Sequence, residues 1–351
     1  MNYLRFLLFP FALLYGLITI IRNALYDKRI YYSSEYDFPL IGVGNLSMGG
    51  TGKTPHVEYL IKLLAPSYLP ATLSRGYKRA TSGFVLADEQ ATAASIGDEP
   101  FQYHFKFPEL AVAVAENRVF GVAELLSAKP ETQVLILDDV FQHRALKPGF
   151  QLLITDYKQL FTTDYLIPMG RLRELRRGAS RADVIVVSKC PSTITLQEQE
   201  NIRKAIAKYS TATVHFSFIK YLPAYPLFAK EVLELNRSKK IILVAGIAYP
   251  KAVLDELMQQ GYECIPFSFS DHYNFRLDDL ERIKRVVMQH GNSLSAFQLL
   301  TTEKDAMRLL PYKDWFLEND IPLWVQPIAV EFKDSKFDEQ IFEYVKRASE
   351  D

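Results

Sequence analysis

A glycine-rich segment at residues 44–54 constrains the fold of this chain more than any other stretch. The apolar run over residues 38–43 before it predicts a short buried strand, and the apolar spacing over residues 55–64 after it predicts a helix. Strand, glycine-rich turn and helix together are typical of a phosphate-binding loop (P-loop). Glycines let several backbone N–H groups point at one anion, and the helix N-terminus adds its positive dipole end. In such a loop Lys53 reaches the terminal phosphates, and the hydroxyl of Thr54 can hold Mg²⁺.

The loop differs from the commonest P-loop pattern at one position. Ser47 stands where a glycine is usual, five residues before Gly52. The run over residues 49–54 is more similar to the variant loop of the deviant-Walker nucleotide hydrolases. The alternative is an ordinary β–α turn that happens to contain a lysine, but Gly-Lys-Thr at the start of a predicted helix favours phosphate binding.

Composition narrows the class of protein. A chain of 351 residues is long enough for two domains or one large one, and 48% apolar residues can fill real cores. The formal net charge is zero, so we expect no nucleic-acid partner. Cys190 and Cys264 lie far apart and form no metal or redox spacing, which favours a reduced, cytoplasmic setting.

The N-terminus is more apolar than that of an ordinary soluble enzyme. Residues 6–21 are almost wholly apolar, but these 16 residues fall short of the roughly 20 that a spanning helix needs. Basic residues flank the run, and residues 21–23 offer no small-residue signal cleavage site. We therefore expect residues 1–35 to form an uncleaved, peripheral or monotopic helical region at the cytoplasmic face of the inner membrane. A buried core helix and a true single span are the alternatives.

Two pairs of carboxylates follow or open predicted elements. Residues 133–139 predict a buried strand that ends in Asp138 and Asp139, the Walker B arrangement for Mg²⁺. Asp98 and Glu99 open a predicted helix. They are either helix caps or groups that act as a general base or help to hold Mg²⁺, and the local sequence leaves both interpretations open.

Several arginines stand where a phosphate could be bound. Arg171 follows Gly170 at a turn, and a guanidinium binds phosphate oxygens in pairs, so Arg171 is the best candidate. Arg75 ends a predicted strand, and Arg118 begins a predicted helix. Each of these two is either a phosphate ligand or a solvated cation.

The alternation of predicted strands and helices favours an α/β fold. We expect a P-loop NTPase-like parallel sheet sandwiched by helices, a second, smaller α/β domain, and the apolar N-terminal helix. The predicted boundaries are 1–35 for the membrane-associated region, 36–210 for the P-loop kinase core, 211–238 for linker strands and 239–351 for the C-terminal domain.

As a set, the motifs resemble those of the tetraacyldisaccharide 4′-kinase (lipid A 4′-kinase) family. The resemblance extends from residue 1 to about residue 330, and the chain departs from the family pattern at Lys78 and Val140, where glycine is usual. The segments that carry it are residues 45–54, 74–77, 97–100, 138–143, 170–174, 271–272 and 302–305.

The resemblance implies transfer of the γ-phosphate of ATP, with Mg²⁺, to the 4′-hydroxyl of tetraacyldisaccharide 1-phosphate, forming lipid IVA in lipid A biosynthesis. It implies that Asp98 takes the proton of that hydroxyl with His272 as its partner, while Lys53 stabilises developing charge. The residues expected to bind the nucleotide are Asn45, Ser47, Gly49, Gly50, Thr51, Gly52, Lys53, Thr54 and Arg171. Those expected at Mg²⁺ are Thr54, Asp138, Asp139 and Glu99.

Two other functions share parts of this pattern. A deviant-Walker ATPase or GTPase that acts as a switch or metallochaperone would need the P-loop, but neither the apolar N-terminus nor Asp98 with His272. A membrane-tethered scaffold that binds nucleotide without catalysis would show no turnover with lipid and Mg-ATP. An assay of phosphate transfer to a lipid acceptor distinguishes the kinase from the switch and from the scaffold.

Overall fold

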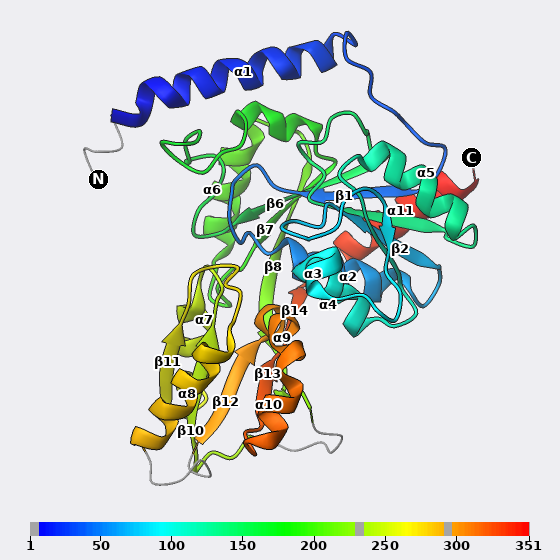
Figure 1. Cartoon of the computed structure of the whole chain (residues 1–351). Helices are drawn as coiled ribbons and strands as arrows, with labels where there is room; N and C mark the ends of the chain where they lie inside the picture. The colour runs from blue at the N-terminus through cyan, green and yellow to red at the C-terminus, as the bar shows by residue number, and fades with distance from the viewer. Residues whose placement is uncertain (1–6, 229–234, 291–296, 351) are drawn as a thin grey trace. The chain divides into compact units, whose positions relative to one another are not determined.

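The computed structural model describes residues 7–228, 235–290 and 297–350. The chain divides into two compact units, one built from Met1–Lys220 and Ala329–Asp351 and the other from Tyr221–Ile328. Each unit has its own sheet and its own core, and each is described by itself. Both are α/β, which confirms the predicted fold class (Figure 1).

The first unit is organised around a nine-stranded sheet, and its central strand leads into the P-loop. This strand, β1 (Leu40–Gly44), pairs in parallel with β5 (Val134–Asp138) on one side and β6 (Phe150–Asp156) on the other. The order across the sheet is β14-β8-β7-β6-β1-β5-β2-β4-β3, and β3 runs antiparallel to β4. The other strands are β2 (Pro70–Ser74), β3 (Val85–Leu86), β4 (Ala111–Val114), β7 (Val184–Ser188), β8 (Thr213–Tyr221) and β14 (Ile328–Phe332).

Helices cover both faces of this sheet because its central strands are buried on both sides. Along β5, Val134 and Ile136 face one core, while Leu135 and Leu137 face another. Side chains of α2, α4 and α11 close the first core, and α5 and α6 pack on the opposite face. These helices are α2 (Lys53–Leu64), α3 (Ala93–Ile96), α4 (Asp98–Lys106), α5 (Arg118–Ala128), α6 (Leu196–Ala207) and α11 (Lys336–Glu350), with a 3₁₀ helix at Arg176–Arg181.

Local sequence explains where several helices begin. Thr195 accepts from the N–H of Glu198, whose carboxylate accepts back from the Thr195 N–H, so a capping box starts α6. Asn117 caps α5 by accepting from the N–H of Phe120. Helix α2 instead starts after Gly52, whose φ of 94° lies in the left-handed region. Only glycine adopts that conformation without a steric cost, so the turn depends on Gly52.

The second unit is built on a five-stranded sheet in the order β11-β10-β12-β13-β9, parallel except for β9. Helix α7 packs on one face through Val253 and Leu257, and α8, α9 and α10 pack on the other. The elements are β9 (Tyr225–Pro226), β10 (Lys240–Ala245), α7 (Pro250–Gln259), β11 (Cys264–Ser268), α8 (Leu277–His290), β12 (Phe297–Thr302), α9 (Glu303–Leu309), a 3₁₀ turn (Leu310–Tyr312), α10 (Lys313–Glu318) and β13 (Leu323–Gln326).

The end of the chain returns to the first unit, whereas the sequence analysis grouped residues 239–351 in one domain. Strand β14 lies beside β8 in the first sheet. Helix α11 buries Phe337 and Ile341 in the first core. Its Tyr344 hydroxyl bonds both the N–H and the carbonyl of Leu40, at 3.0 and 3.1 Å, across 304 residues of sequence. The apolar face of α11 therefore packs in the core of the first unit, next to β1.

The predicted linker strands at residues 211–238 divide between the two sheets. Strand β8 pairs in parallel with β7 of the first sheet. Strand β9 pairs antiparallel with β13 of the second. Residues 229–234, which we expected to be extended, lie outside the described residues.

The apolar N-terminal run forms one long helix, α1 (Phe9–Asp27), drawn in dark blue in Figure 1. Its buried residues are Ala12 and Gly16. Large apolar side chains along it stay exposed, including Leu13 at 64% and Ile18 at 57%. By length and composition the helix could cross a membrane. Because its apolar face is uncovered, α1 is not a buried core helix.

Candidate active site

The P-loop lies between β1 and α2, at the carboxyl end of the central strand. The φ angles of Gly49 and Gly52, 100° and 94°, lie in the left-handed region and allow the loop to curl. The fully buried Asn45 donates from Nδ2 to Thr51 Oγ1 at 2.7 Å and ties the two ends of the loop together. Since α2 begins at Lys53, its first N–H groups face the loop.

Two carboxylates at the end of β5 stand next to this loop. Val43 of β1 is in register with Asp138 of β5, so the strand ends where the P-loop begins. Asp139 follows with a φ of 50°, and its Oδ1 lies 3.5 Å from Nζ of Lys53. The Asp139 side chain is 39% exposed, so this ion pair remains accessible to a ligand. The P-loop lysine and the predicted Walker B acids thus lie together.

Asp138 and Asp139 have opposite electrostatic surroundings. Burial, and then the charge of Glu99, raise the pKa of Asp138 to about 7, although Lys53 opposes the shift. Burial also disfavours charge on Asp139, but Lys53 and Arg173 outweigh it and hold the pKa of Asp139 well below its usual range. The pair therefore combines one fixed negative charge with one carboxyl whose charge depends on what binds beside it.

Arg173 joins the carboxylates to the P-loop, a role that the sequence analysis missed. Its guanidinium donates to both carboxylate oxygens of Asp139, at 2.8 and 3.1 Å, and to the backbone carbonyl of Asn45 at 2.9 Å. Nothing in the segment alone marks this role, because the partner Asp139 lies 34 residues away in the sequence.

The same segment brings Arg171 to the P-loop. The N–H of Met48 donates to the carbonyl of Arg171 at 2.7 Å, and the N–H of Arg173 donates to that of Leu46 at 2.8 Å. A Cβ added to Gly49 would lie 4.0 Å from the Arg171 guanidinium. Arg171 therefore lies where it can reach a bound phosphate, and its contact with the nucleotide stays a prediction.

Helix α4 presents the other pair of carboxylates. Asp98 and Glu99 occupy its first turn, and the N-cap residue is Gly97, with no side-chain cap. Glu99 is close enough to raise the pKa of Asp138 by its charge. Their place in the first turn also suits the positive end of the helix, so both interpretations stay open, and Asp98 and Glu99 stay candidates for chemistry at the Lys53 site.

Arg118 is buried, so it is not a solvated surface cation. It is 3% exposed and donates from one nitrogen to the carbonyls of Ala115 and Glu116, each at 3.1 Å. Burial lowers its pKa to about 10, while the charge of Asp139 opposes the shift. Arg118 therefore adds positive potential near the P-loop carboxylates.

His272, the expected partner of Asp98, belongs to the second unit. Its φ is 58°, and its N–H donates to the carbonyl of Gly246 at 3.2 Å. The ring lies between two cations, with Nε2 at 3.1 Å from Nζ of Lys304 and Nδ1 at 3.3 Å from Nη2 of Arg308. Since the two units are described separately, the pairing of Asp98 with His272 stays a prediction.

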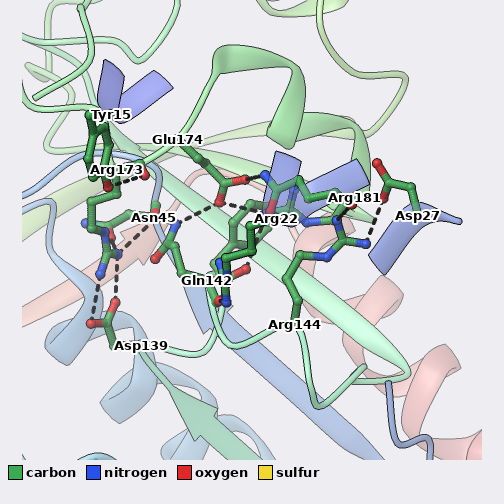
Figure 2. Close-up of polar contacts among 12 residues, drawn as sticks. Tyr15, Arg22, Asp27, Asn45, Asp139, Gln142, Arg144, Arg173, Glu174 and Arg181 are labelled. Atoms are coloured by element: carbon green, nitrogen blue, oxygen red, sulfur yellow. Dashed lines mark hydrogen bonds and ion pairs between the residues drawn. The ribbon is translucent and has the colours of Figure 1, made fainter. Parts of the chain in front are cut away.

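Helix α1 is hydrogen-bonded to the loops that carry the site (Figure 2). The Tyr15 hydroxyl donates to the carbonyl of Arg173 at 2.6 Å. Asn23 donates to the Glu174 carboxylate at 2.9 Å. Glu174 also accepts from Gln142 at 3.0 Å, and Gln142 donates to the P-loop backbone at 2.9 Å. The polar side of α1 therefore contacts the site loops, while its apolar side chains stay exposed.

A parallel α/β sheet, a glycine loop opening a helix, and a lysine beside strand-end carboxylates define a P-loop protein that binds a nucleoside triphosphate. The chain belongs to the tetraacyldisaccharide-1-P 4′-kinase family, whose model matches residues 4–346. It is a kinase, as the motifs predict.

Individual relatives agree with this assignment. The tetraacyldisaccharide 4′-kinase of Flavobacterium johnsoniae is 45% identical over 99% of this chain and 98% of its own length. That of Bacteroides thetaiotaomicron is 41% identical over 97% of this chain and 93% of its own. The crystal structure of LpxK from Aquifex aeolicus in complex with ATP covers 97% of this chain and 99% of its own, with 28% identity and a TM-score of 0.75. The switch and chaperone alternatives are not favoured.

Proposed function

We propose that this kinase transfers the γ-phosphate of ATP to the 4′-hydroxyl of tetraacyldisaccharide 1-phosphate, forming lipid IVA in lipid A biosynthesis. The observation that carries the proposal is the Lys53–Asp139 pair, 3.5 Å apart beside the P-loop, in a chain of this kinase family. Phosphoryl transfer depends on positioning and charge neutralisation, which these groups supply.

The direct test is incubation of the purified protein with labelled ATP, Mg²⁺ and the acceptor in detergent, followed by chromatography of the lipid. Label in the lipid supports the proposal. Release of inorganic phosphate without a labelled lipid contradicts it and supports the ATPase or GTPase alternative. No turnover of either kind supports the scaffold.

The nucleotide would be held mainly by backbone and cationic groups. Within residues 49–53, the N–H groups other than that of Thr51, which donates to Gly49 O, would cradle the phosphates, helped by the positive end of α2. Lys53 would stabilise charge that develops on the oxygen between the β- and γ-phosphates, and Arg171 would bind a phosphate of the nucleotide or of the acceptor. The hydroxyl oxygen attacks the γ-phosphorus, and ADP leaves with the electrons of the broken P–O bond.

The residues present fit a Mg²⁺ ion. Tyr103 donates to Oδ2 of Asp138 at 3.0 Å, while Oδ1 is buried with no partner among the described residues. Such an orphaned oxygen suits a cation that prefers oxygen ligands. Among the described residues, no three His, Cys, Asp or Glu side chains lie close enough together to hold a metal by themselves, so phosphates and waters would supply the other ligands. Thr54, Asp138, Asp139 and Glu99 would hold it, and bound Mg²⁺ would neutralise phosphate charge.

The acceptor hydroxyl needs a group that takes its proton, and we assign this role to Asp98. His272 would orient Asp98 and share the proton, because an imidazole hydrogen-bonded to a carboxylate does both. Asp98 and His272 belong to different units, so this step would need groups from both. We expect Asp98→Asn and His272→Gln each to lower kcat roughly 10²–10⁴-fold while ATP still binds. Turnover near that of the wild type in either variant would remove that assignment.

The acceptor is a membrane lipid, so we place the enzyme at the cytoplasmic face of the inner membrane with α1 as its docking element. Replacing the exposed side chains Leu13, Leu17 and Ile18 by serine removes apolar area but keeps the contacts of Tyr15 and Asn23. We expect this variant to move from the membrane to the soluble fraction with ATP binding retained. The control is Leu196→Ser, at an exposed leucine outside α1. Membrane fractionation unchanged by the triple replacement would contradict the placement.

A further inference from the structure

Side chains from outside the P-loop hold three consecutive carbonyls of the loop, those of residues 50–52. Two of these side chains, Ser188 and Lys189, stand at the end of β7, and the third, His56, lies in the first turns of α2. The three contacts are Lys189 Nζ with Gly50 O, Ser188 Oγ with Thr51 O (2.5 Å) and His56 Nδ1 with Gly52 O (2.7 Å).

Neighbouring strands fix these side chains in turn. Asp156 of β6 is in register with Ser188 of β7, and its carboxylate lies 2.9 Å from Nζ of Lys189. Ser217 of β8 places its hydroxyl 2.9 Å from Nε2 of His56. Ser188 is fully buried. Asp156 and Ser188 end β6 and β7, whereas Ser217 lies in the middle of β8. These three strands support the contacts to the loop, with Ser188 and His56 buried and the Lys189 side chain 30% exposed.

The His56 ring acts as a neutral donor. The carbonyl of Gly52 can only accept, so Nδ1 carries the hydrogen, and Nε2 accepts from the Ser217 hydroxyl. Burial lowers the pKa of His56 to about 4, in agreement with a neutral ring at pH 7. The same tautomer satisfies both contacts at once.

Holding the carbonyls fixes the direction of the N–H groups. In a trans peptide the C=O and the following N–H point in opposite directions. With the carbonyls of Thr51 and Gly52 held by Ser188 and His56, the N–H groups of Gly52 and Lys53 point away from those two side chains. The N–H of Thr51 closes the turn by donating to Gly49 O at 2.9 Å.

We propose that Ser188, Lys189 and His56 form a carbonyl clamp, a set of positioning residues that holds the P-loop in its phosphate-binding form before the nucleotide arrives. The inference rests on the proposed binding of ATP at this loop. Preorganised donors bind an anion without reorganising, so the clamp contributes to affinity for the phosphates. It holds bound substrate and transition state alike, so its loss raises KM more than it lowers kcat.

The test compares Lys189→Met and Ser188→Ala with the wild type in the full-length protein. We expect Lys189→Met to raise the Kd for ATP and for ADP about tenfold each, the factor that one lost charge-assisted hydrogen bond gives. Ser188→Ala should raise both about threefold. The Kd for AMP should not change in either variant, and kcat should stay within about threefold of the wild type. Lys189→Arg should restore most of the affinity, because it keeps a cationic donor.

Two controls separate the clamp from a general loss of structure or function. Lys204→Met removes an exposed lysine on α6 and should change no nucleotide affinity. Wild-type ATP binding and turnover, measured first, test the proposed function separately. With a wild type that binds ATP, unchanged ATP affinity in Ser188→Ala and Lys189→Met overturns the clamp. An equal loss for AMP, or a fall in kcat without a rise in KM, also overturns it. If Lys189→Met does not fold, Ser188→Ala alone decides the question.

Discussion

The two units use the same local topology for opposite purposes. In each, a buried parallel strand runs through a glycine-containing turn into a helix, from β1 to α2 and from β10 to α7. At the P-loop, the side chains of Ser188, Lys189 and His56 contact three backbone carbonyls, and the proposed clamp leaves the N–H groups of Gly52 and Lys53 available to a phosphate. After β10, the carboxylate of Asp305 accepts from the N–H of Gly246 at 2.9 Å. In the second unit the turn is therefore occupied by the protein's own carboxylate, that of Asp305, whereas the corresponding turn of the first unit is the proposed phosphate site.

The ion pairs at the two turns also differ in their exposure to solvent. Asp305 is fully buried and bonds Arg308 at 2.9 Å, and burial raises the pKa of Asp305 although Arg308 opposes the shift. The Lys53–Asp139 pair stays partly exposed. Removing one partner of a buried pair leaves an unpaired buried charge, whereas an accessible pair can exchange its partner for a ligand. In both units the turn between strand and helix can bind an anion. The charges of the surrounding side chains decide whether that anion is a phosphate or the protein's own carboxylate.

The largest expected effect is at the accessible pair. Lys53→Met should lower kcat/KM on the order of 10³–10⁵-fold, the range for a cation that stabilises phosphoryl transfer. Unfolding by urea should be little changed, because the lysine is not part of a core. Steady-state kinetics and urea titrations of the same preparation check both parts. Activity within tenfold of the wild type would contradict the assignment of the accessible pair in the first unit to catalysis.

The thiols give a second comparison. Burial, then the charge of Asp156, raise the pKa of Cys190 to about 12 from a usual 9, so its thiolate fraction at pH 8 falls about 10³-fold. Burial also raises the pKa of Cys264, which is only half-buried. Cys264→Ser should therefore label with a disulfide reagent far more slowly than Cys190→Ser, with both reacting fast in denaturant. Equal slow rates for both, or a fast Cys190, would contradict the assignment.

The closed pair should matter for stability. Asp305→Ala leaves Arg308 buried without its carboxylate and removes the acceptor for the Gly246 N–H, so we expect a loss of about 3 kcal/mol in unfolding free energy. Asp139→Asn in the first unit should cost less than about 1 kcal/mol, because that side chain is partly exposed. Urea titration of both variants measures the difference. Equal losses would remove the distinction between the two sites.

The smallest effects come from the two turn glycines. Gly52→Ala places a Cβ at a φ of 94° and should cost about 1–2 kcal/mol, with a corresponding loss of ATP affinity. Gly246→Ala would bring a Cβ to 3.1 Å from Asp305 Oδ1, a contact that a shift of a few tenths of an ångström relieves. It should leave ATP affinity unchanged. Calorimetric titration with ATP distinguishes the two variants, and an equal loss in both would show that the second turn also serves the nucleotide.

Much of the fold was predictable because it follows local patterns. The apolar runs before Lys53 and Asp138 gave the strands β1 and β5, and the acids at the end of β5 lie beside Lys53 as expected. Arg173 was not singled out, because its value lies in a bidentate contact with Asp139, 34 residues away. The clamp was not predicted either, since nothing local marks Ser188 or Lys189 as neighbours of Gly50.

By itself, the sequence predicted the glycine-rich turn before α2, the strand that ends in Asp138 and Asp139, the α/β class and the apolar helix at the N-terminus. These features depend on glycine freedom, apolar periodicity and chain order, which act over a few residues. Only the tertiary structure decided which side chains hold the loop and to which unit the chain's end belongs. Helix α11 joins the first core through Tyr344 and β1, 304 residues apart. Such contacts arise when strands align and buried polar groups must find partners, and that choice is made by the packed fold as a whole.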